Sequence, residues 1–176
     1  MKIISTFVPG LSTFKFGNVD ELERLLDLWN DKMYLYEYFE INLDRFSYYD
    51  LTSTREAVEA TLKQVRGLKD KLIDMALHNR GNLDSLFKNL DNNAYKSGIL
   101  LPKQKLPQRW LRMYAIKIES NHYVITGGAL KPTKYMDEGA ETLLELEKLE
   151  RCRNYLQDQG VYDALTFNEL IFDDEI

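Results

Sequence analysis

The feature that most constrains the fold is a long amphipathic helical pattern across about residues 53–78. Apolar residues recur there at steps of three and four for about seven turns, at Val58, Leu62, Val65, Leu68, Leu72 and Met75. Ser53 followed by Glu56 has the spacing of a capping box, which predicts the start of the helix. Such a helix must bury its apolar stripe, on this chain or on a neighbouring one.

Two β-rich runs, residues 110–118 and 123–130, predict an antiparallel hairpin, because a short polar link separates them. Side chains alternate across a strand, so one face of the first run should carry Trp110, Arg112, Tyr114, Ile116 and Ile118. Gly127-Gly128 in the second run predicts a bulge or a close approach of another part of the chain.

These patterns predict an α+β fold in a single domain of 176 residues. The expected sheet is small and antiparallel, built from an N-terminal hairpin around Pro9-Gly10 and the hairpin at 110–130. Several helices should pack against it, including the one at about 53–78. Two local expectations are that Asn18 caps the first helix and that residues 96–108 form a loop.

The composition excludes several kinds of chemistry. Cys152 is the one cysteine and there are two histidines, which excludes an internal disulfide, a cysteine metal site and a His-rich metal site. No phosphate-binding glycine loop, GxSxG elbow or HExxH motif occurs. We therefore expect no cofactor and no metal. The N-terminus is too short and polar for a signal peptide, and no apolar run approaches the ~20 residues of a membrane span. A cytoplasmic protein that does not use a membrane is expected.

Charge is distributed unevenly along the chain, whose formal net charge is −5. Residues 99–135 carry seven Lys or Arg and one acidic residue, Glu119, whereas residues 136–176 carry three Lys or Arg and twelve acidic residues. The net negative charge argues against non-specific binding of nucleic acid. The cationic stretch between acidic flanks therefore needs an explanation of its own.

Phosphate binding is one explanation, since Lys and Arg neutralise phosphates and Tyr stacks on bases. The candidate RNA-binding residues are Lys103, Lys105, Arg109, Lys117 and His122. Cleavage of RNA through its own 2′-hydroxyl needs a base, an acid and cations but no metal, and the candidates for those roles are Arg112, Tyr114, Lys131 and Lys134. The alternative explanation is that Lys and Arg simply protect an edge strand from pairing.

Three stretches occur in an order found in one group of bacterial toxins. They are Leu86-Phe87-Lys88-Asn89-Leu90-Asp91, Leu111-Arg112-Met113-Tyr114-Ala115-Ile116 and the run from Tyr123 to Lys134. Across about residues 83–150 this order resembles the RelE/HigB superfamily, ribosome-associated endoribonucleases that pair with an antitoxin. Arg112 resembles the family's strand arginine, and Lys131 and Lys134 resemble its lysines after the last strand. The resemblance implies a toxin of a toxin–antitoxin system, metal-independent mRNA cleavage, and a cognate antitoxin and RNA or the ribosome as partners.

On this interpretation the single domain has three parts: an N-terminal hairpin and helical part (1–80), a RelE-like core (83–158) and an acidic C-terminal helix or tail (160–176). The chain departs from the family in being acidic and in having Pro132 where a second lysine is usual. A second likeness rests on Leu28-Trp29-Asn30-Asp31, on residues 110–116 and on residues 123–128. Through these stretches the chain resembles, nearly end to end, a set of uncharacterised proteins from Bacteroidetes-type bacteria, which implies no function.

Two alternatives to an enzyme follow from the same residues. One is a non-catalytic interaction protein with a toxin-like fold, in which the acidic tail, Glu169 to Ile176, binds a basic partner or lies over the basic hairpin. The other is a phage or mobile-element accessory factor, which the sequence does not separate from the first.

Overall fold

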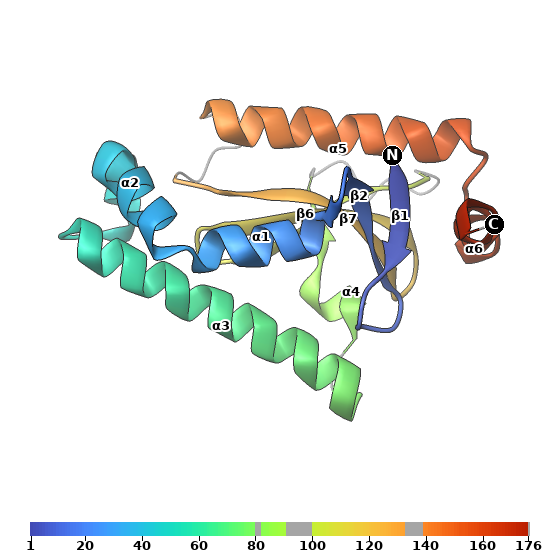
Figure 1. Ribbon diagram of the computed structural model, residues 1–176, viewed down its shortest axis with the longest axis horizontal. Helices are drawn as coiled ribbons and strands as arrows, with labels where there is room; N and C mark the ends of the chain where they lie inside the picture. Colours follow the sequence, from blue (N-terminus) through green and yellow to red (C-terminus); the bar gives the residue numbers. More distant parts are fainter. Residues whose placement is uncertain (80–81, 91–99, 133–138, 176) are drawn as a thin grey trace.

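One sheet forms the middle layer of the molecule, and helices cover both of its faces (Figure 1). The computed structural model describes residues 1–79, 82–90, 100–132 and 139–175. The sheet runs β1-β2-β7-β6-β5-β4, with β3 paired to β2 beside this path. Its strands are β1 (Lys2–Ser5), β2 (Leu11–Phe16), β3 (Val19–Asp20), β4 (Lys88–Asn89), β5 (Lys103–Gln108), β6 (Leu111–Glu119) and β7 (His122–Leu130). The α+β class is confirmed.

The helices divide between the two faces. In Figure 1, α1 and α3 lie on one side of the sheet, whereas α5 runs along the other side and α6 follows it. The helices are α1 (Glu21–Asn30), α2 (Lys32–Asn42), the 3-10 helix η1 (Leu43–Tyr49), α3 (Thr54–His78), α4 (Leu83–Leu86), α5 (Ala140–Asp158) and α6 (Ala164–Glu175). The long helix is confirmed, with the Glu56 amide donating to the Ser53 hydroxyl at 3.1 Å.

Two local expectations were wrong. The first helix is capped by Asp20, which accepts from the Glu23 amide, and not by Asn18. The chain stays extended past Asn18 because β3 pairs with the end of β2 before the helix begins. The second is the loop at 96–108, whose last six residues form β5, paired with β6 along its whole length. Pro107 is compatible with this strand, since the neighbouring β4 is only two residues long.

The two predicted hairpins share one sheet, but the sheet is not wholly antiparallel. β1 and β2 pair antiparallel around Pro9-Gly10, as do β6 and β7. Between these hairpins, β2 and β7 run parallel over three residue pairs, from Leu11 opposite Tyr123 to Thr13 opposite Ile125. The parallel pair was not predicted, because no crossover unit in the sequence indicates it.

The bulge predicted at the glycine pair is confirmed. Ala115 pairs with Ile125 but the next residue back, Tyr114, pairs with Gly127, so Thr126 is the extra residue in β7. The predicted face of β6 is correct from Arg112 onward but wrong for Trp110, which precedes the strand. Trp110 packs with the opposite face, because the chain turns sharply at Arg109, where φ is +55°.

Each face of the sheet buries its own core. The helices α1, α2 and α3 cover the aromatic one, which includes Trp29, Trp110, Phe39 and Phe46, all at most 1% exposed. Helices α5 and α6 cover the other, which includes Phe14, Tyr114, Ile116 and Leu149. The sheet is therefore covered on both faces, so its solvent contacts lie at its edges and at the strand ends.

Candidate functional site

A hollow of about 460 Å³ lies at the edge of the sheet where β4, β5 and β6 meet α4. Its lining residues are Asp84, Phe87, Lys88, Asn89, Gln104, Lys105, Lys117 and Tyr123. Three of them are lysines and one is an aspartate, so the hollow has a net positive charge in an otherwise acidic protein.

The three lysines come from three different strands. Lys88 of β4 lies directly opposite Lys105 of β5 in the antiparallel register, and Lys117 lies on β6. Like charges placed opposite one another in a sheet are destabilising, so a bound anion would lower the energy of this pair. Short edge strands rich in lysine also resist edge-to-edge pairing, and both effects act here.

Asp84 organises the floor of the hollow. Its carboxylate accepts hydrogen bonds from the Tyr123 hydroxyl at 2.6 Å, the Ser120 hydroxyl at 2.5 Å and the Asn121 amide at 3.1 Å. Partial burial opposes ionisation of Asp84, but hydrogen bonds led by those from Ser120 and Tyr123 outweigh it and hold the pKa of this carboxyl well below its usual range. Burial and the hydrogen bond to Asp84 raise the pKa of Tyr123 far above its ordinary value. Tyr123 is therefore a fixed donor at neutral pH.

Lys117 is held in place by the same residues. Its ammonium group lies 3.3 Å from the Asp84 carboxylate and 5.8 Å from the centre of the Tyr123 ring. The same Tyr123 ring stacks on Phe87, with 4.5 Å between the ring centres. The Lys117 side chain is still 32% exposed, so a ligand can reach a cation whose position is already set.

Two amide side chains complete the lining. The Gln104 amide group donates to the Asn89 side-chain oxygen at 2.7 Å and also to the Lys103 carbonyl. Amides offer both donors and acceptors. Gln104 is only 2% exposed and fixes Asn89, so the hollow can bind an anion through its lysines and a neutral polar group through Asn89.

The residues predicted to be catalytic do not line this hollow. Tyr114 is 2% exposed within the core under α5, and burial raises the pKa of its hydroxyl to about 12. The guanidinium of Arg112 donates to the carbonyls of Arg109 and Leu111, and its Nε is buried without a partner. Lys131 is 5% exposed. Lys134 lies outside the described residues.

The residues predicted to bind RNA are spread along the sheet. Lys105 and Lys117 line the hollow. Lys103 pairs with Glu150 of α5 at 2.9 Å. Arg109 is exposed at the β5–β6 turn and lies over the rings of Trp110 and Tyr49. His122 begins β7, half-buried, with its ring nitrogen 3.2 Å from the Ser120 carbonyl.

Sequence reasoning missed two important residues of the hollow, Lys88 and Asp84. Asp84 lies in the short helix α4, and Lys88 begins β4 directly after the chain leaves that helix at Phe87. Asp84 had no local signal, because its partners lie more than thirty positions away in the β6–β7 turn. Lys88 lies opposite Lys105 of β5, so its place at the site can be predicted only after β5 has been recognised as a strand.

A second group of charged side chains lies at the other end of the β6–β7 hairpin, beside Gly127 and Gly128. Their ion pairs form a closed ring. Lys148 contacts Glu21 at 3.0 Å and Glu145 at 2.8 Å, while Arg24 contacts Glu21 at 2.7 Å and Glu145 at 3.4 Å. Glu145 also accepts from the Gly128 amide at 3.2 Å. These four described side chains carry two positive and two negative charges, so the ring joins α1 to α5 with its own charges in balance.

The glycine pair gives this ring its space. A side chain at Gly127 would begin 2.0 Å from a Glu145 oxygen, and one at Gly128 would begin 2.6 Å from the Arg112 carbonyl. Beyond Ile125 the edge of β7 is no longer paired with β2. Glu145 accordingly accepts a backbone donor that the sheet leaves unused.

Among the described residues, no helix has the length and apolar character needed to cross a membrane, and no group of three or more His, Cys, Asp or Glu side chains could hold a metal ion. Comparisons with protein-family models, curated proteins and solved structures find no match for this chain. The resemblance to the RelE/HigB superfamily stays a prediction, and function has to be argued from the site itself.

Proposed function

We propose that the chain binds RNA through the phosphate backbone, at the hollow lined by Lys88, Lys105 and Lys117. The observation that carries this proposal is that lysines from three strands line one hollow. Phosphate contacts made by lysine supply most of the affinity in sequence-independent binding. The acidic remainder of the chain repels a polyanion, which favours binding at this hollow over other parts of the surface.

The other lining groups favour a nucleotide over a simple anion. Asn89 is partly exposed, and its side-chain amide can hydrogen-bond to a base edge or to a 2′-hydroxyl. The hollow's volume of about 460 Å³ is within the range of small-molecule sites. Phe87 and Tyr123 are buried and stacked on each other, so they form the wall of the hollow and do not serve as a base-stacking platform.

The proposal is limited to binding, without cleavage. Tyr114 is buried in a core and Arg112 is bonded to backbone carbonyls, so neither is presented at the hollow as an acid or base. A toxin-like, metal-independent endoribonuclease stays a prediction of the sequence resemblance. Its test is included in the binding experiment, because the same RNA can be examined for cleavage afterwards.

The test is fluorescence anisotropy with a labelled single-stranded RNA of about 12 nucleotides, titrated at several salt concentrations. Replacing Lys88, Lys105 and Lys117 together with Ala should weaken binding at least about tenfold at low salt. Three lost phosphate contacts should also reduce the slope of log affinity against log salt by about 2.

The matched control removes three exposed lysines elsewhere, Lys2, Lys32 and Lys63, and has the same net charge as the test variant. It should bind almost as the wild type does. Equal weakening in the two variants would show that only net charge matters, and the proposal would then be wrong. RNA fragments on a gel that appear with the wild type and disappear with Arg112→Ala would extend the function to cleavage.

A further inference from the structure

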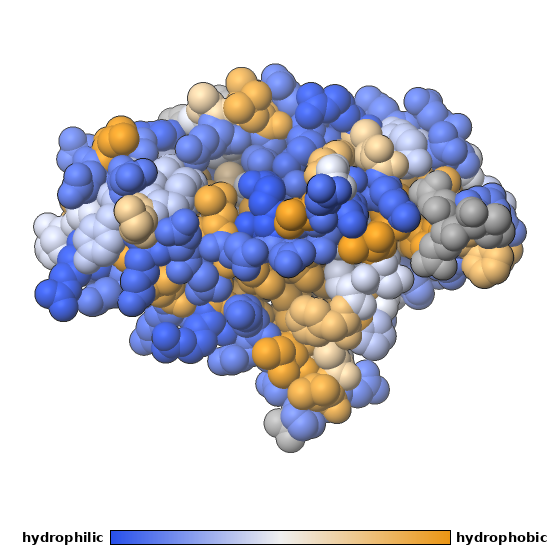
Figure 2. Space-filling model, in the orientation of Figure 1, coloured by the Kyte–Doolittle hydropathy of each residue, from blue (hydrophilic) through white to orange (hydrophobic). Residues whose placement is uncertain are grey.

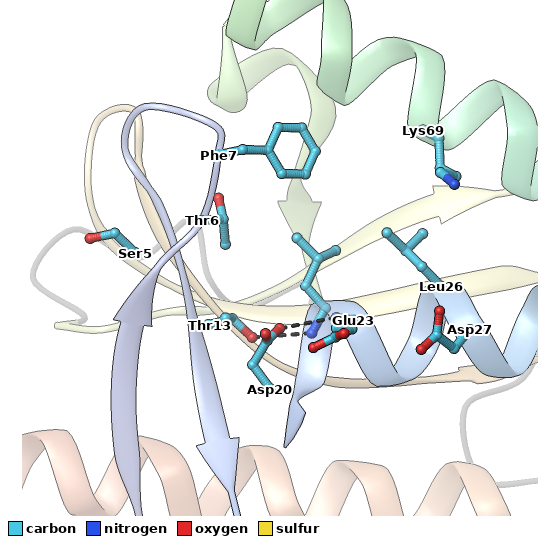
Figure 3. A pocket seen from close by; sticks show the side chains of 10 residues that line it. Ser5, Thr6, Phe7, Thr13, Asp20, Glu23, Leu26, Asp27 and Lys69 are labelled. Carbon is cyan, nitrogen blue, oxygen red and sulfur yellow. Dashed lines mark hydrogen bonds between the residues drawn. The ribbon is translucent and has the colours of Figure 1, made fainter. Parts of the chain in front are cut away.

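A second depression lies between the β1–β2 turn, the start of α1 and the middle of α3 (Figure 3), far in sequence from the lysine hollow. Its volume is about 370 Å³. Its lining residues are Ser5, Thr6, Phe7, Thr13, Asp20, Leu22, Glu23, Leu26, Asp27 and Lys69. We call it the α1–α3 groove.

The walls of this groove are fixed by hydrogen bonds at the start of α1. The Thr13 hydroxyl accepts from the Leu22 amide at 3.2 Å, and Asp20 accepts from the Glu23 amide at 3.0 Å. On the β1–β2 side, the Thr6 hydroxyl donates to the Leu11 carbonyl at 2.7 Å. The groove is therefore formed before any ligand binds, which reduces the entropy lost on association.

Apolar side chains lie along the groove and continue beyond it. Phe7 is 55% exposed, and Figure 3 shows its ring pointing across the opening toward the side of α3 that carries Lys69. Four and eight positions after Lys69, Ile73 and Leu77 are 40% and 72% exposed, which places them on the same stripe of the helix. Figure 2 shows hydrophobic atoms gathered over this end of α3 and the β1–β2 turn. Contiguous apolar surface of this kind marks interaction sites.

The charges at the groove select the kind of partner. Asp20, Glu23 and Asp27 contribute three carboxylates, whereas Lys69 is the one cation among the lining residues. A polyanion would be repelled here, so this surface is unsuited to the RNA proposed for the lysine hollow. A partner that contacts Phe7, Ile73 and Leu77 while facing these carboxylates needs apolar residues on one side and basic residues beside them.

We propose that the α1–α3 groove binds a basic amphipathic helical segment of another protein. Apolar residues of that helix, one turn apart, contact Phe7, Leu26 and the exposed stripe of α3, and its Lys or Arg residues face Glu23 and Asp27. The proposal is independent of the RNA-binding proposal, since the two surfaces share no lining residue.

The experiment uses a labelled synthetic peptide of about 15 residues, with Leu at helical spacing on one face and Lys elsewhere. A second peptide has the same Leu residues and Glu in place of Lys. Anisotropy with the full chain should show binding of the basic peptide at least about tenfold tighter than of the acidic one. NMR amide shifts on binding should concentrate at Phe7, in the first turns of α1 and at residues 69–77.

Two pairs of variants make the test specific. Phe7→Ser with Leu77→Gln removes apolar surface, and its control is Met33→Ser with Ile41→Gln on α2, where both side chains are also exposed. Glu23→Gln with Asp27→Lys changes the charge, and its control is Glu37→Gln with Glu40→Lys on exposed positions of α2. Asp20 is left unchanged because it caps α1.

Both groove variants should bind the basic peptide at least about tenfold more weakly, with both controls near the wild type. Equal loss in the controls would overturn the proposal, as would shifts that map to another face. Concentration-dependent dimerisation that Phe7→Ser with Leu77→Gln abolishes would also overturn it, because the occupant would then be a second copy of this chain. Melting curves of all four variants establish that each is folded.

Discussion

The two ends of the β6–β7 hairpin are both held by charged side chains, but with opposite consequences. At the glycine end, Glu21 and Lys148 lie in a closed ring and their side chains are 5% and 16% exposed. At the turn end, Asp84 and Lys117 are 29% and 32% exposed and lie beside a hollow with two further lysines. The same residue types therefore stabilise the fold at one end and remain accessible to a ligand at the other.

Charge balance and burial therefore distinguish a structural cluster of charged side chains from a binding surface, whereas the presence of charge alone does not. In the ring each charge has two opposite partners, so burial is compensated. Among the described residues that line the hollow, three are lysines and one, Asp84, is a carboxylate, so these side chains carry a net positive charge that an anion would offset. Substitutions at Gly128, Glu21 and Asp84 test whether the two ends of the hairpin differ in this way.

Gly128→Ala should have the largest effect on stability. Its new methyl group would begin 2.6 Å from the Arg112 carbonyl and 3.0 Å from both Leu25 and Trp29, and neither a backbone nor a buried indole can move aside easily. The free energy of unfolding in urea should fall by about 3 kcal/mol. The control is Gly67→Ala in α3, where the nearest atom is at 3.4 Å. That change should raise stability by about 1 kcal/mol, because Gly is a poor helix residue. Equal effects at both sites would show that the glycine end is not closely packed.

Glu21→Gln should have the next largest effect. The substitution leaves Lys148 and Arg24 with only Glu145 as a partner in a poorly exposed ring, and an unbalanced charge in such a place is costly. We expect a loss of about 2 kcal/mol in the free energy of unfolding, smaller than for a fully buried pair because Arg24 is 37% exposed. RNA affinity should not change. A loss of RNA binding with normal stability would contradict the division between the two ends.

Asp84→Asn should cost about 1 kcal/mol at neutral pH, since Asn keeps an acceptor but loses the charge that faces Lys117. The pKa of Asp84 is held below its ordinary value of 3.8. Its contribution is therefore complete above that ordinary value and is lost as the pH falls through the folded-state pKa. The stability difference between wild type and variant should be constant from about pH 7 to 5 and shrink below about pH 4. A difference that does not vary with pH would show that the hydrogen bonds to Asp84 do not depend on its charge.

The same substitution should leave RNA binding intact or strengthen it, because Asp84 is the one acidic side chain among the described residues that line the hollow. This outcome separates the two roles of Asp84, which positions Lys117 and also neutralises part of its charge.

Local sequence signals predicted the parts of the fold whose partners are close in the chain. The cap at Ser53 and the helix after it each depend on residues within one or two turns. The hairpin of β6 and β7 and its bulge also followed from neighbouring residues, with Gly127 marking the irregularity.

The features that were missed depend on distant partners. Pairing of β2 with β7 joins segments that lie far apart in the chain. Strand β5 has little β-propensity of its own, and pairing on both sides forms it. At the candidate site, Lys105 and Lys117 were identified from charge alone. Asp84 and the carboxylates of the ring, Glu21 and Glu145, look like ordinary solvated helix residues until the fold brings cations to them.

The parallel pairing of β2 and β7 also determines the earliest point in synthesis at which the sheet can be completed, before α5 and α6 cover its second face. β2 emerges from the ribosome early, but the strand that completes its pairing follows near the end of the sheet-forming sequence. Until His122 and the residues after it have been translated, the backbone groups along one side of β2 remain open to pairing with other chains. The nascent chain is thus most prone to associate with its neighbours after the long helix has been made and before β7 arrives.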